Sequence, residues 1–365
     1  MRVLVVNAGS SSLKLRLLDA DNGVMRNADM AVAESGIDAT ALAACLCLWP
    51  APDVVGHRIV HGGTRFTGPV RIDADVERVL RGLVDLAPLH QPKSLAAYDA
   101  VSALLPAVPA VACFDTAFHA DLPGRASTYA VPREWCERYG VRRYGFHGLS
   151  HAYASRRAAD MIGQPLKAPR IVTCHLGAGA SLAAIVGGRS VDTTMGFTPL
   201  EGLVMATRSG SVDPGLVLWL QEHEHLTTDD VATALERRSG LLALTGAGDM
   251  REVERRAQAG DSAARLGFEV FVHRLVTSIG AMTAAAGGLD ALVFTGGIGE
   301  HSADVRRAAC ERLAYLGVRI DTGANAQLRA DADIAASRAD VRVLVVTARE
   351  DLEIANEARG VMNAN

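Results

Sequence analysis

The chain has 365 residues, of which 49% are hydrophobic, and a formal net charge of -4. This length predicts two domains with sizeable cores, and the charge leaves no basic face for nucleic acid or a membrane surface. The apolar start is too short for a signal peptide, and no segment approaches the roughly 18 apolar residues of a membrane span. The 6 cysteines include no CxxC pair, which indicates free thiols in a reducing cytoplasm rather than a zinc site.

The N-terminal segment is predicted to be a β-hairpin whose tip binds an anion. The apolar run 1–6 breaks at NAGSSSLK and then resumes. Gly9 lets the backbone turn without a side-chain clash. Ser10, Ser12 and Lys14 add hydrogen-bond donors and a positive charge, which favours phosphate. A Gly-Ser turn between strands is more often only a turn, so the interpretation depends on whether similar turns recur.

Strands and helices alternate along the rest of the chain. Strands are expected at 2–7, 13–19, 53–60, 108–115, 170–176, 181–186, 189–194, 290–296 and 341–346. Helices are expected at 73–86, 94–104, 150–161, 213–222, 263–286 and 350–361. A meander followed by βα units, occurring twice, predicts a duplicated α/β domain with a central cleft and with functional residues at the strand ends that face it. The duplication alone sets the domain boundary near residue 146.

Two later segments repeat the glycine-rich turn of the hairpin. RIVTCHLGAGASLAAIVGG has Gly177 and Gly179 between two apolar strands, and ALVFTGGIGEHSADV has a strand, three glycines and a helix. Ser302 is expected to cap that helix, with Asp304 in its first turn, which leaves free amides for a ligand. Neither a GxxxxGK[ST] loop nor a GxGxxG motif occurs, which disfavours P-loop and dinucleotide-binding proteins.

Together these segments resemble the two phosphate hairpins and the adenosine turn of the acetate kinase family, in the sugar kinase, Hsp70 and actin superfamily. Further signatures follow in that family's order up to about residue 355: GHRIVHGG, APLHQP, FDTAFH, RYGFHGLSH, MGFTPLEGL, TRSGSVDPG and AREDLEIA. The resemblance implies two ribonuclease H-like domains at 1–145 and 146–350, with a last helix of about 351–365 returning to the first. It also implies Mg²⁺- or Mn²⁺-dependent, reversible phosphoryl transfer from ATP to acetate, giving ADP and acetyl phosphate, by a homodimer formed through the second domain.

Four residues are expected to carry the transfer. Arg58 follows a buried-looking strand, where an unpaired guanidinium would be costly, so its partner is an internal carboxylate or, by the family pattern, the substrate. Arg208 and His147 would pass as a loop arginine and a structural histidine, but the resemblance assigns both to the transferring phosphoryl group. Asp115 either caps the next helix or, as the resemblance implies, acts as acid/base or orients Mg²⁺, and the sequence leaves these roles open.

The resemblance also implies a metal site and an acyl pocket. Glu350 opens a helix, where capping is an alternative, and it matches a Mg²⁺ ligand with Asn7 as its partner across the cleft. The acyl pocket is small and apolar, and each of its members alone would pass as a core residue. Its expected members are Val60, Leu89, His90, Phe146 and Pro199.

The expected nucleotide site departs from the family pattern. Besides Ser10, Ser12 and Lys14, the family pattern selects His175, Leu176, Gly177, Ala178, Gly179, Asp249, Met250, Arg251, Gly297, Ile298, Gly299, Glu300 and His301. Ala178, Met250 and His301 replace an asparagine, an aromatic residue and another asparagine that the family usually has. The sequence therefore does not decide whether the phosphoryl donor is ATP, GTP or pyrophosphate, or whether the acceptor is acetate or propionate. A nucleotide-gated binding protein of the actin or Hsp70 kind is the alternative of another class, although it has no use for Arg58, His147 and Arg208.

Overall fold

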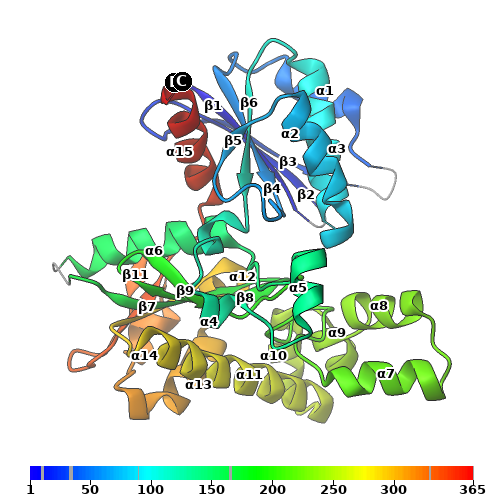
Figure 1. Ribbon diagram of the computed structural model, residues 1–365. Helices are drawn as coiled ribbons and strands as arrows, with labels where there is room; N and C mark the ends of the chain where they lie inside the picture. Colours follow the sequence, from blue (N-terminus) through cyan, green and yellow to red (C-terminus); the bar gives the residue numbers. More distant parts are fainter. Residues whose placement is uncertain (10–11, 33–35, 89, 164–166, 329, 365) are drawn as a thin grey trace. The chain divides into compact units, whose positions relative to one another are not determined.

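The computed structural model describes residues 1–9, 12–32, 36–88, 90–163, 167–328 and 330–364. These residues form two compact units, each with one mixed β-sheet and packed helices (Figure 1). Unit 1 comprises Met1–Ala120, Phe146–Tyr153 and Arg349–Asn365, and unit 2 comprises Asp121–Gly145 and Ala154–Ala348. Residues 121–145 therefore lie in unit 2, whereas residues 146–153 and Glu350 lie in unit 1.

The sheet of unit 1 has the strand order β3-β2-β1-β4-β6-β5. Its strands are β1 (Val3–Ala8), β2 (Ser12–Leu18), β3 (Val24–Ala31), β4 (Val54–Ile59), β5 (Val70–Arg71) and β6 (Ala110–Phe114). The expected N-terminal hairpin is present, because β1 and β2 are antiparallel. Strands β1, β4 and β6 run parallel, so their carboxyl ends meet at one edge of the sheet.

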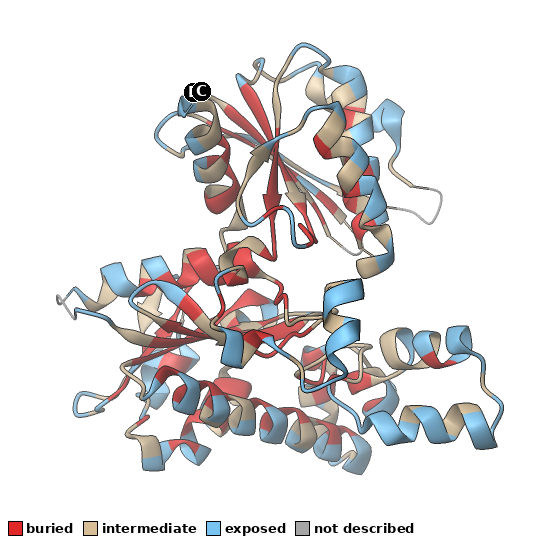
Figure 2. Cartoon of the chain, in the orientation of Figure 1, coloured by how far each residue is buried: buried red, intermediate tan, exposed pale blue. Residues whose placement is uncertain are grey.

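Helices cover both faces of this sheet. They are α1 (Ala39–Leu46), α2 (Ala74–Gly82), η1 (Val84–Leu86), α3 (Gln91–Leu104), η2 (Ala117–His119) and α15 (Glu350–Asn363). Because side chains alternate along a strand, Val5 packs toward Ile354 of α15 while Leu4 packs toward Leu42 of α1. Figure 2 shows the resulting buried core. Gly56 permits the close approach of α15, since a Cβ there would lie 2.7 Å from Cγ2 of Ile354.

The sheet of unit 2 repeats this topology with the order β11-β12-β10-β7-β8-β9. Its strands are β7 (Arg170–Leu176), β8 (Ala180–Val186), β9 (Arg189–Thr193), β10 (Ala291–Thr295), β11 (Ala332–Asp333) and β12 (Arg342–Val345). The antiparallel β7-β8 hairpin corresponds to β1-β2, and the parallel strands β10 and β12 correspond to β4 and β6. This correspondence confirms the duplicated α/β fold.

Unit 2 carries most of the helices. They are α4 (Gly124–Ser127), α5 (Arg133–Tyr139), α7 (Pro214–His223), α8 (Thr228–Arg237), α9 (Gly240–Thr245), α10 (Met250–Gln258), α11 (Ser262–Ala286), α12 (Gly296–His301), α13 (Ala303–Arg312), η3 (Ala314–Leu316) and α14 (Thr322–Ala326). Helix α6 (Gly148–Ile162) begins in unit 1 and ends in unit 2. Helix α11 packs against β7, β8 and β9. Within the described parts of the chain, no helix has both the length and the apolar character needed to cross a membrane.

The glycine-rich segment after β10 differs from the expected turn. It forms the short helix α12, which starts at Gly296 with a φ of 77°, a left-handed conformation that glycine adopts without strain. The next helix begins as predicted, because the Ser302 side chain accepts a hydrogen bond of 3.0 Å from the amide of Val305. Asp304 lies in the first turn of that helix, α13.

Candidate active site

A chain of polar side chains lies at the carboxyl edge of the unit 1 sheet. Arg58, near the end of β4, donates from Nε to Oδ1 of Asp115 at 3.0 Å and from Nη2 to Oδ2 at 2.6 Å. Its Nη1 donates to Oδ1 of Asn7 at 3.2 Å, and Nδ2 of Asn7 donates to Oε2 of Glu350 at 2.7 Å. The Asp115 side chain is 2% exposed and that of Arg58 is 14% exposed. Four residues that are distant in sequence thus form one partly buried polar group.

These contacts show the partners of Arg58, Asp115 and Glu350 within the protein, whereas their roles toward a substrate or a metal remain predictions. The internal carboxylate expected as one possible partner of Arg58 is Asp115. Asp115 binds this guanidinium, and the following helix η2 has Thr116 at its N-cap position without a side-chain cap. Likewise, Glu350 accepts from Asn7, and helix α15 has no capping side chain. The expectation that Asn7 and Glu350 face each other across a cleft was wrong, because α15 packs on β1 and β4 within unit 1.

Burial and neighbouring charges shift the pKa values of Asp115 and Arg58 in opposite directions. Burial raises the pKa of Asp115, although the Arg58 guanidinium counteracts this effect. Burial also lowers the pKa of Arg58, but the carboxylates of Asp115 and Glu350 outweigh it and hold the pKa above its usual value. Arg58 is therefore a fixed cation that two acidic side chains neutralise.

His147 has an unusual backbone beside this group. Its φ is 55°, a left-handed conformation that costs a non-glycine residue on the order of 1 kcal/mol and is often found at functional sites. The amide of the next residue, Gly148, donates to the carbonyl oxygen of Asp115 at 2.8 Å. A Cβ on Gly148 would overlap that oxygen, so glycine lets the His147 turn approach the end of β6.

The expected acyl-pocket residues are divided between the two units. Val60 and Phe146 are buried in unit 1, where the ring of Phe146 contacts that of His61 at 5.5 Å between centroids. His90 precedes α3 in the same unit, and Leu89 lies outside the described residues. Pro199 belongs to unit 2. A common pocket for these residues remains a prediction.

Arg208 also belongs to unit 2, where nearby loop atoms hold its guanidinium. Nη1 of Arg208 donates to the carbonyl oxygen of Pro199 at 3.1 Å and lies 3.8 Å from the sulfur of Met205. Arg208 was expected to act on the same phosphoryl group as Arg58 and His147. Those two residues belong to unit 1, so this joint action remains a prediction.

Unit 2 contains a pocket of about 520 Å³ beside the tip of the β7-β8 hairpin and the starts of α10 and α12. This volume lies in the range typical of small-molecule sites. Of the expected nucleotide residues, those that line it are Gly177, Ala178, Asp249, Met250, Arg251, Gly297, Ile298 and His301. Others of that set do not line it: His175, Leu176, Gly179, Gly299 and Glu300. Ser12 and Lys14 lie in unit 1, and Ser10 is outside the described residues.

Sequence reasoning missed three residues of this pocket: Gly248, Glu254 and Ser302. Glu254 lies one helical turn after Met250 on α10, and this spacing puts both on one face of the helix. The hydroxyl of Ser302 donates to Glu254 Oε1, and burial raises the pKa of the Glu254 carboxyl. The pocket thus has one half-buried acidic group in a wall formed largely by glycine and apolar side chains.

Three comparisons with known proteins identify the relatives of this chain. The Acetokinase family model matches residues 45–356. The chain belongs to the acetokinase family. A protein from Deinococcus deserti named acetate kinase is 45% identical, with 100% of this chain and 98% of the relative covered.

Two solved structures have the same fold as this chain. The acetate kinase of Porphyromonas gingivalis matches with a TM-score of 0.89 and 35% identity, and 99% of each chain is covered. A propionate kinase from Francisella tularensis matches with a TM-score of 0.91 and 34% identity, again over 99% of each chain. The chain is therefore a phosphotransferase of the acetokinase family, which acts on a carboxyl acceptor.

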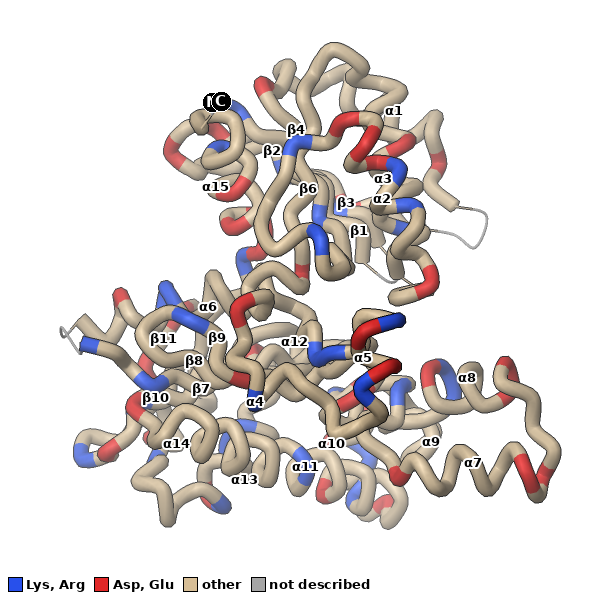
Figure 3. Tube along the Cα trace, in the orientation of Figure 1, with Lys and Arg blue, Asp and Glu red and all other residues tan. Residues whose placement is uncertain are grey.

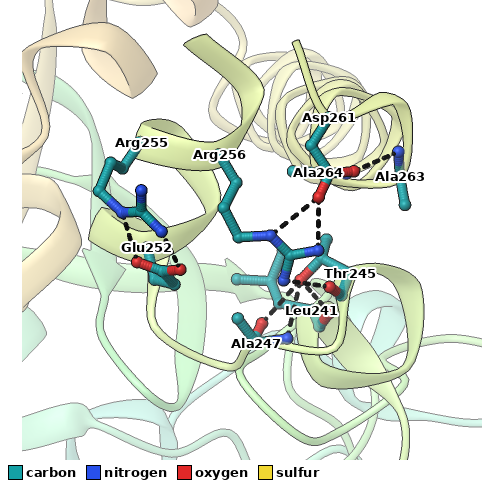
Figure 4. Close-up of polar contacts among 9 residues, drawn as sticks. All are labelled: Leu241, Thr245, Ala247, Glu252, Arg255, Arg256, Asp261, Ala263 and Ala264. Atoms are coloured by element: carbon teal, nitrogen blue, oxygen red, sulfur yellow. Dashed lines mark hydrogen bonds and ion pairs between the residues drawn. The ribbon is translucent and has the colours of Figure 1, made fainter. Parts of the chain in front are cut away.

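In this acetokinase, a polar network involves helix α10, which also carries the pocket residues Met250 and Glu254 (Figure 4). Arg256 of α10 donates to the carbonyl oxygen of Thr245 at 2.7 Å and pairs with Asp261, which caps α11. The Thr245 hydroxyl accepts from the amide of Ala247 at 3.0 Å. These contacts tie the ends of α9, α10 and α11 together and so hold the loop that leads to Asp249 and Met250.

Three of the expected nucleotide residues have contacts within the protein itself: Met250, Glu300 and His301. Met250 is buried in the pocket wall, and Nδ1 of His301 lies 2.9 Å from the carbonyl oxygen of Gly297. Glu300 Oε1 accepts from the amides of Gly296 and Ala348, each at 3.0 Å. Glu300 was expected at the nucleotide, but this carboxylate oxygen stabilises the start of α12.

Proposed function

We propose that this acetokinase transfers the γ-phosphoryl group of ATP reversibly to acetate, giving ADP and acetyl phosphate. The observation that carries the proposal is the full-length likeness to proteins named acetate kinase, with 45% identity across the whole chain in the Deinococcus deserti relative. The pocket of unit 2 supports a nucleoside site, and the polar group around Arg58 supports an anion site.

The proposed reaction is a direct in-line transfer. An acetate oxygen forms a bond to the γ-phosphorus while the bond to the bridging β,γ-oxygen breaks, and ADP leaves with that electron pair. Arg58, Arg208 and His147 stabilise the negative charge of the acceptor and of the transferring group by donating hydrogen bonds. In this role Arg208 acts on the equatorial phosphoryl oxygens.

Arg58 has donors left for a substrate. A guanidinium has five N–H groups in a fixed plane. Nε and one N–H of Nη2 bind Asp115, and one N–H of Nη1 binds Asn7. One N–H on each terminal nitrogen is not used by these contacts. Asp115 therefore serves in the proposal to orient Arg58 rather than to exchange a proton.

In the proposal, the Glu350 carboxylate would hold a hard divalent cation, Mg²⁺ or Mn²⁺, and Asn7 would be its second ligand once the Asn7 side-chain oxygen is released from Arg58. Amide and carboxylate oxygens are the ligands that these ions prefer, and the hydrogen bond of 2.7 Å keeps the two side chains adjacent. Among the residues that the structure describes, no three His, Cys, Asp or Glu side chains are grouped to hold a metal, so water and substrate phosphates would complete the coordination. The ion supplies positive charge for the transferred group when bound.

Propionate kinase is the second candidate function, because the Francisella tularensis structure of that name has a TM-score of 0.91. A hydroxamate assay tests both candidates, with acetate and propionate as acceptors and with ATP, GTP and pyrophosphate as donors. We expect the fastest acyl hydroxamate formation with acetate. A nucleotide-gated binding protein would instead hydrolyse ATP at a rate independent of either acid, and that result would overturn the proposal.

We further propose a homodimer formed through unit 2. Helix α7 has no buried residue (Figure 2), and it exposes Leu216, Leu218 and Trp219 to 45%, 59% and 47%. Its sequence is free of charge from Pro214 to Gln221 (Figure 3), and apolar patches of this kind often mark protein interfaces. Light scattering should give twice the mass of one chain for the wild type. The Leu218→Glu variant should instead give the mass of a single chain.

We also infer that the protein works in the cytoplasm. The support is that all of the cysteines are free: Cys45, Cys47, Cys113, Cys136, Cys174 and Cys310. Free thiols persist in a reducing compartment. Cell fractionation with an antibody would test this location.

A further inference from the structure

Glu201 joins two separate segments of unit 2 through its carboxylate. Oε1 of Glu201 accepts from Nη2 of Arg143 at 2.7 Å, and Oε2 accepts from the Tyr129 hydroxyl. The Arg143 guanidinium also lies over the Tyr129 ring, 5.5 Å from its centroid. Burial raises the pKa of Tyr129, so its hydroxyl stays a neutral donor. Glu201, Arg143 and Tyr129 thus form a closed group, which we call the Glu201 triad.

The Glu201 triad holds the loop 194–203 at several backbone atoms. Nη1 of Arg143 donates to the carbonyl oxygens of Thr194 and Met195 at 3.1 and 3.0 Å. The Tyr129 hydroxyl accepts from the amide of Phe197 at 3.0 Å. A Cβ at Gly196 would overlap both Tyr129 and Glu201, so the triad packs directly on the loop backbone.

This loop supplies the carbonyl group that binds Arg208. Pro199 lies two residues before Glu201, and its carbonyl oxygen accepts from Nη1 of Arg208 at 3.1 Å. The position of that oxygen depends on the loop conformation, which the triad holds at residues on both sides of Pro199. A displacement of about 1 Å in a catalytic group can cost as much as 10²-fold in rate.

We propose that Glu201 is a positioning residue for Arg208. The triad fixes the loop, the loop presents the Pro199 carbonyl, and this carbonyl orients the guanidinium for transfer. The proposal rests on the proposed function, in which Arg208 stabilises the transferring phosphoryl group. Glu201 itself touches neither substrate nor the reacting atoms.

Kinetics of Glu201→Gln and Glu201→Ala test this role. Glutamine keeps one acceptor for the triad, so we expect the kcat of Glu201→Gln to fall roughly 10-fold and that of Glu201→Ala roughly 100-fold. The KM for ATP should stay within about twofold of the wild-type value in both variants, because the nucleotide pocket is unchanged. Tyr129→Phe removes one hydrogen bond and provides a milder variant if Glu201→Ala does not fold. The matched control is Asp290→Asn, which breaks the Arg170–Asp290 ion pair of unit 2 and should leave kcat unchanged.

A double-mutant cycle with Arg208→Ala separates positioning from general destabilisation. If Glu201 acts through Arg208, Glu201→Gln should cause no further loss of kcat in the Arg208→Ala background. Equal losses in both backgrounds, or a loss no greater than that of Asp290→Asn, would overturn the positioning role while leaving the proposed function intact. An unchanged kcat in Arg208→Ala alone would overturn the role of Arg208 in the proposed function, and the positioning role with it.

Discussion

The two units share a strand topology but carry different chemistry near the carboxyl ends of their parallel strands. In unit 1, β4 ends with Arg58 and Ile59, and β6 is followed by Asp115, which pairs with Arg58. In unit 2, the corresponding strand β10 continues into the glycines of α12, beside a pocket whose lining mixes glycine and apolar residues with polar ones such as Asp249 and Glu254. The repeated backbone provides two similar positions, and the side chains place an ion pair at one of them and a pocket beside the other.

This difference has an energetic counterpart. A buried ion pair repays its desolvation only when its geometry and hydrogen bonds are good, and Arg58 meets this condition through Asp115 and Asn7. If the pocket of unit 2 binds the nucleotide as proposed, its glycine and apolar residues offer shape and burial, which discriminate weakly between ligands. Unit 1 should therefore respond strongly to the loss of one charge, whereas unit 2 should respond weakly to a change of nucleotide.

The largest effect is expected from the two arginines. Arg58→Ala and Arg208→Ala should each lower kcat by a factor on the order of 10² or more, because preorganised charge on the transition state is lost. Only Arg58→Ala should also destabilise the protein, by about 3–5 kcal/mol, because Asp115 would keep a buried charge without a partner. Steady-state kinetics and urea unfolding measure both effects, and an unchanged kcat in either variant would contradict its assignment.

The next effect concerns the length of the acyl group. One extra methylene in a fitted apolar pocket costs about 1–3 kcal/mol, so kcat/KM should favour acetate over propionate by roughly 10- to 200-fold. Val60→Ala should narrow or invert this ratio, mainly through a lower KM for propionate. The comparison covers acetate, propionate and butyrate in both proteins. A ratio that Val60→Ala leaves unchanged would remove Val60 from the acyl pocket.

Acid should destabilise unit 1 through its buried histidines. Burial lowers the pKa of His57 to about 3 and those of His61 and His119 to about 4, whereas no described histidine of unit 2 is buried. In the unfolded chain these histidines bind protons with a pKa near 6.5, well above their pKa values in the folded protein. The stability that the neutral, buried histidines contribute is therefore complete above pH 6.5 and is lost as the pH falls toward 4. As the pH falls from 6.5 to 5, one such histidine lowers the free energy of unfolding by about 2 kcal/mol.

The test of this acid effect uses His57→Leu. Neither ring nitrogen of His57 has a hydrogen-bond partner, so leucine should preserve stability at pH 7 and reduce the loss at pH 5 by about 2 kcal/mol. Urea unfolding followed by Trp49 fluorescence, with Trp135 and Trp219 replaced by Phe, reports on unit 1. His273→Asn on the exposed face of α11 is the control. An identical pH dependence in wild type and His57→Leu would refute the explanation.

The smallest effect is expected in the choice of nucleotide. Ala178, Met250 and His301 offer few side-chain contacts to the base and ribose, so kcat/KM for ATP and GTP should differ by less than about tenfold. Ala178→Asn should restore one hydrogen bond of about 1 kcal/mol and lower the KM for ATP roughly fivefold. A preference for ATP above a hundredfold in the wild type would show that other groups read the base.

Local sequence patterns were sufficient to predict the strands and helices whose apolar residues recur with a clear period. Every strand expected from apolar runs is present, and Ser302 caps α13 as its position before the helix predicted. Strand β3 was not predicted, because its residues 24–31 are mostly exposed and an edge strand with little burial shows no apolar alternation. The helical form of the segment after β10 was also missed, since its glycines are typical of turns.

The sequence by itself determined the duplicated architecture, the hairpins and the candidates for the site, because these depend on residues close together in the chain. Only the tertiary structure decided the partners of those candidates. Arg58 and Asp115 are 57 positions apart, and Asn7 and Glu350 are 343 positions apart. Parallel strand pairing and the return of α15 to unit 1 bring them together. The physical reason is that a buried charge must be paired in space, and spacing along the chain does not specify which distant group pairs with it.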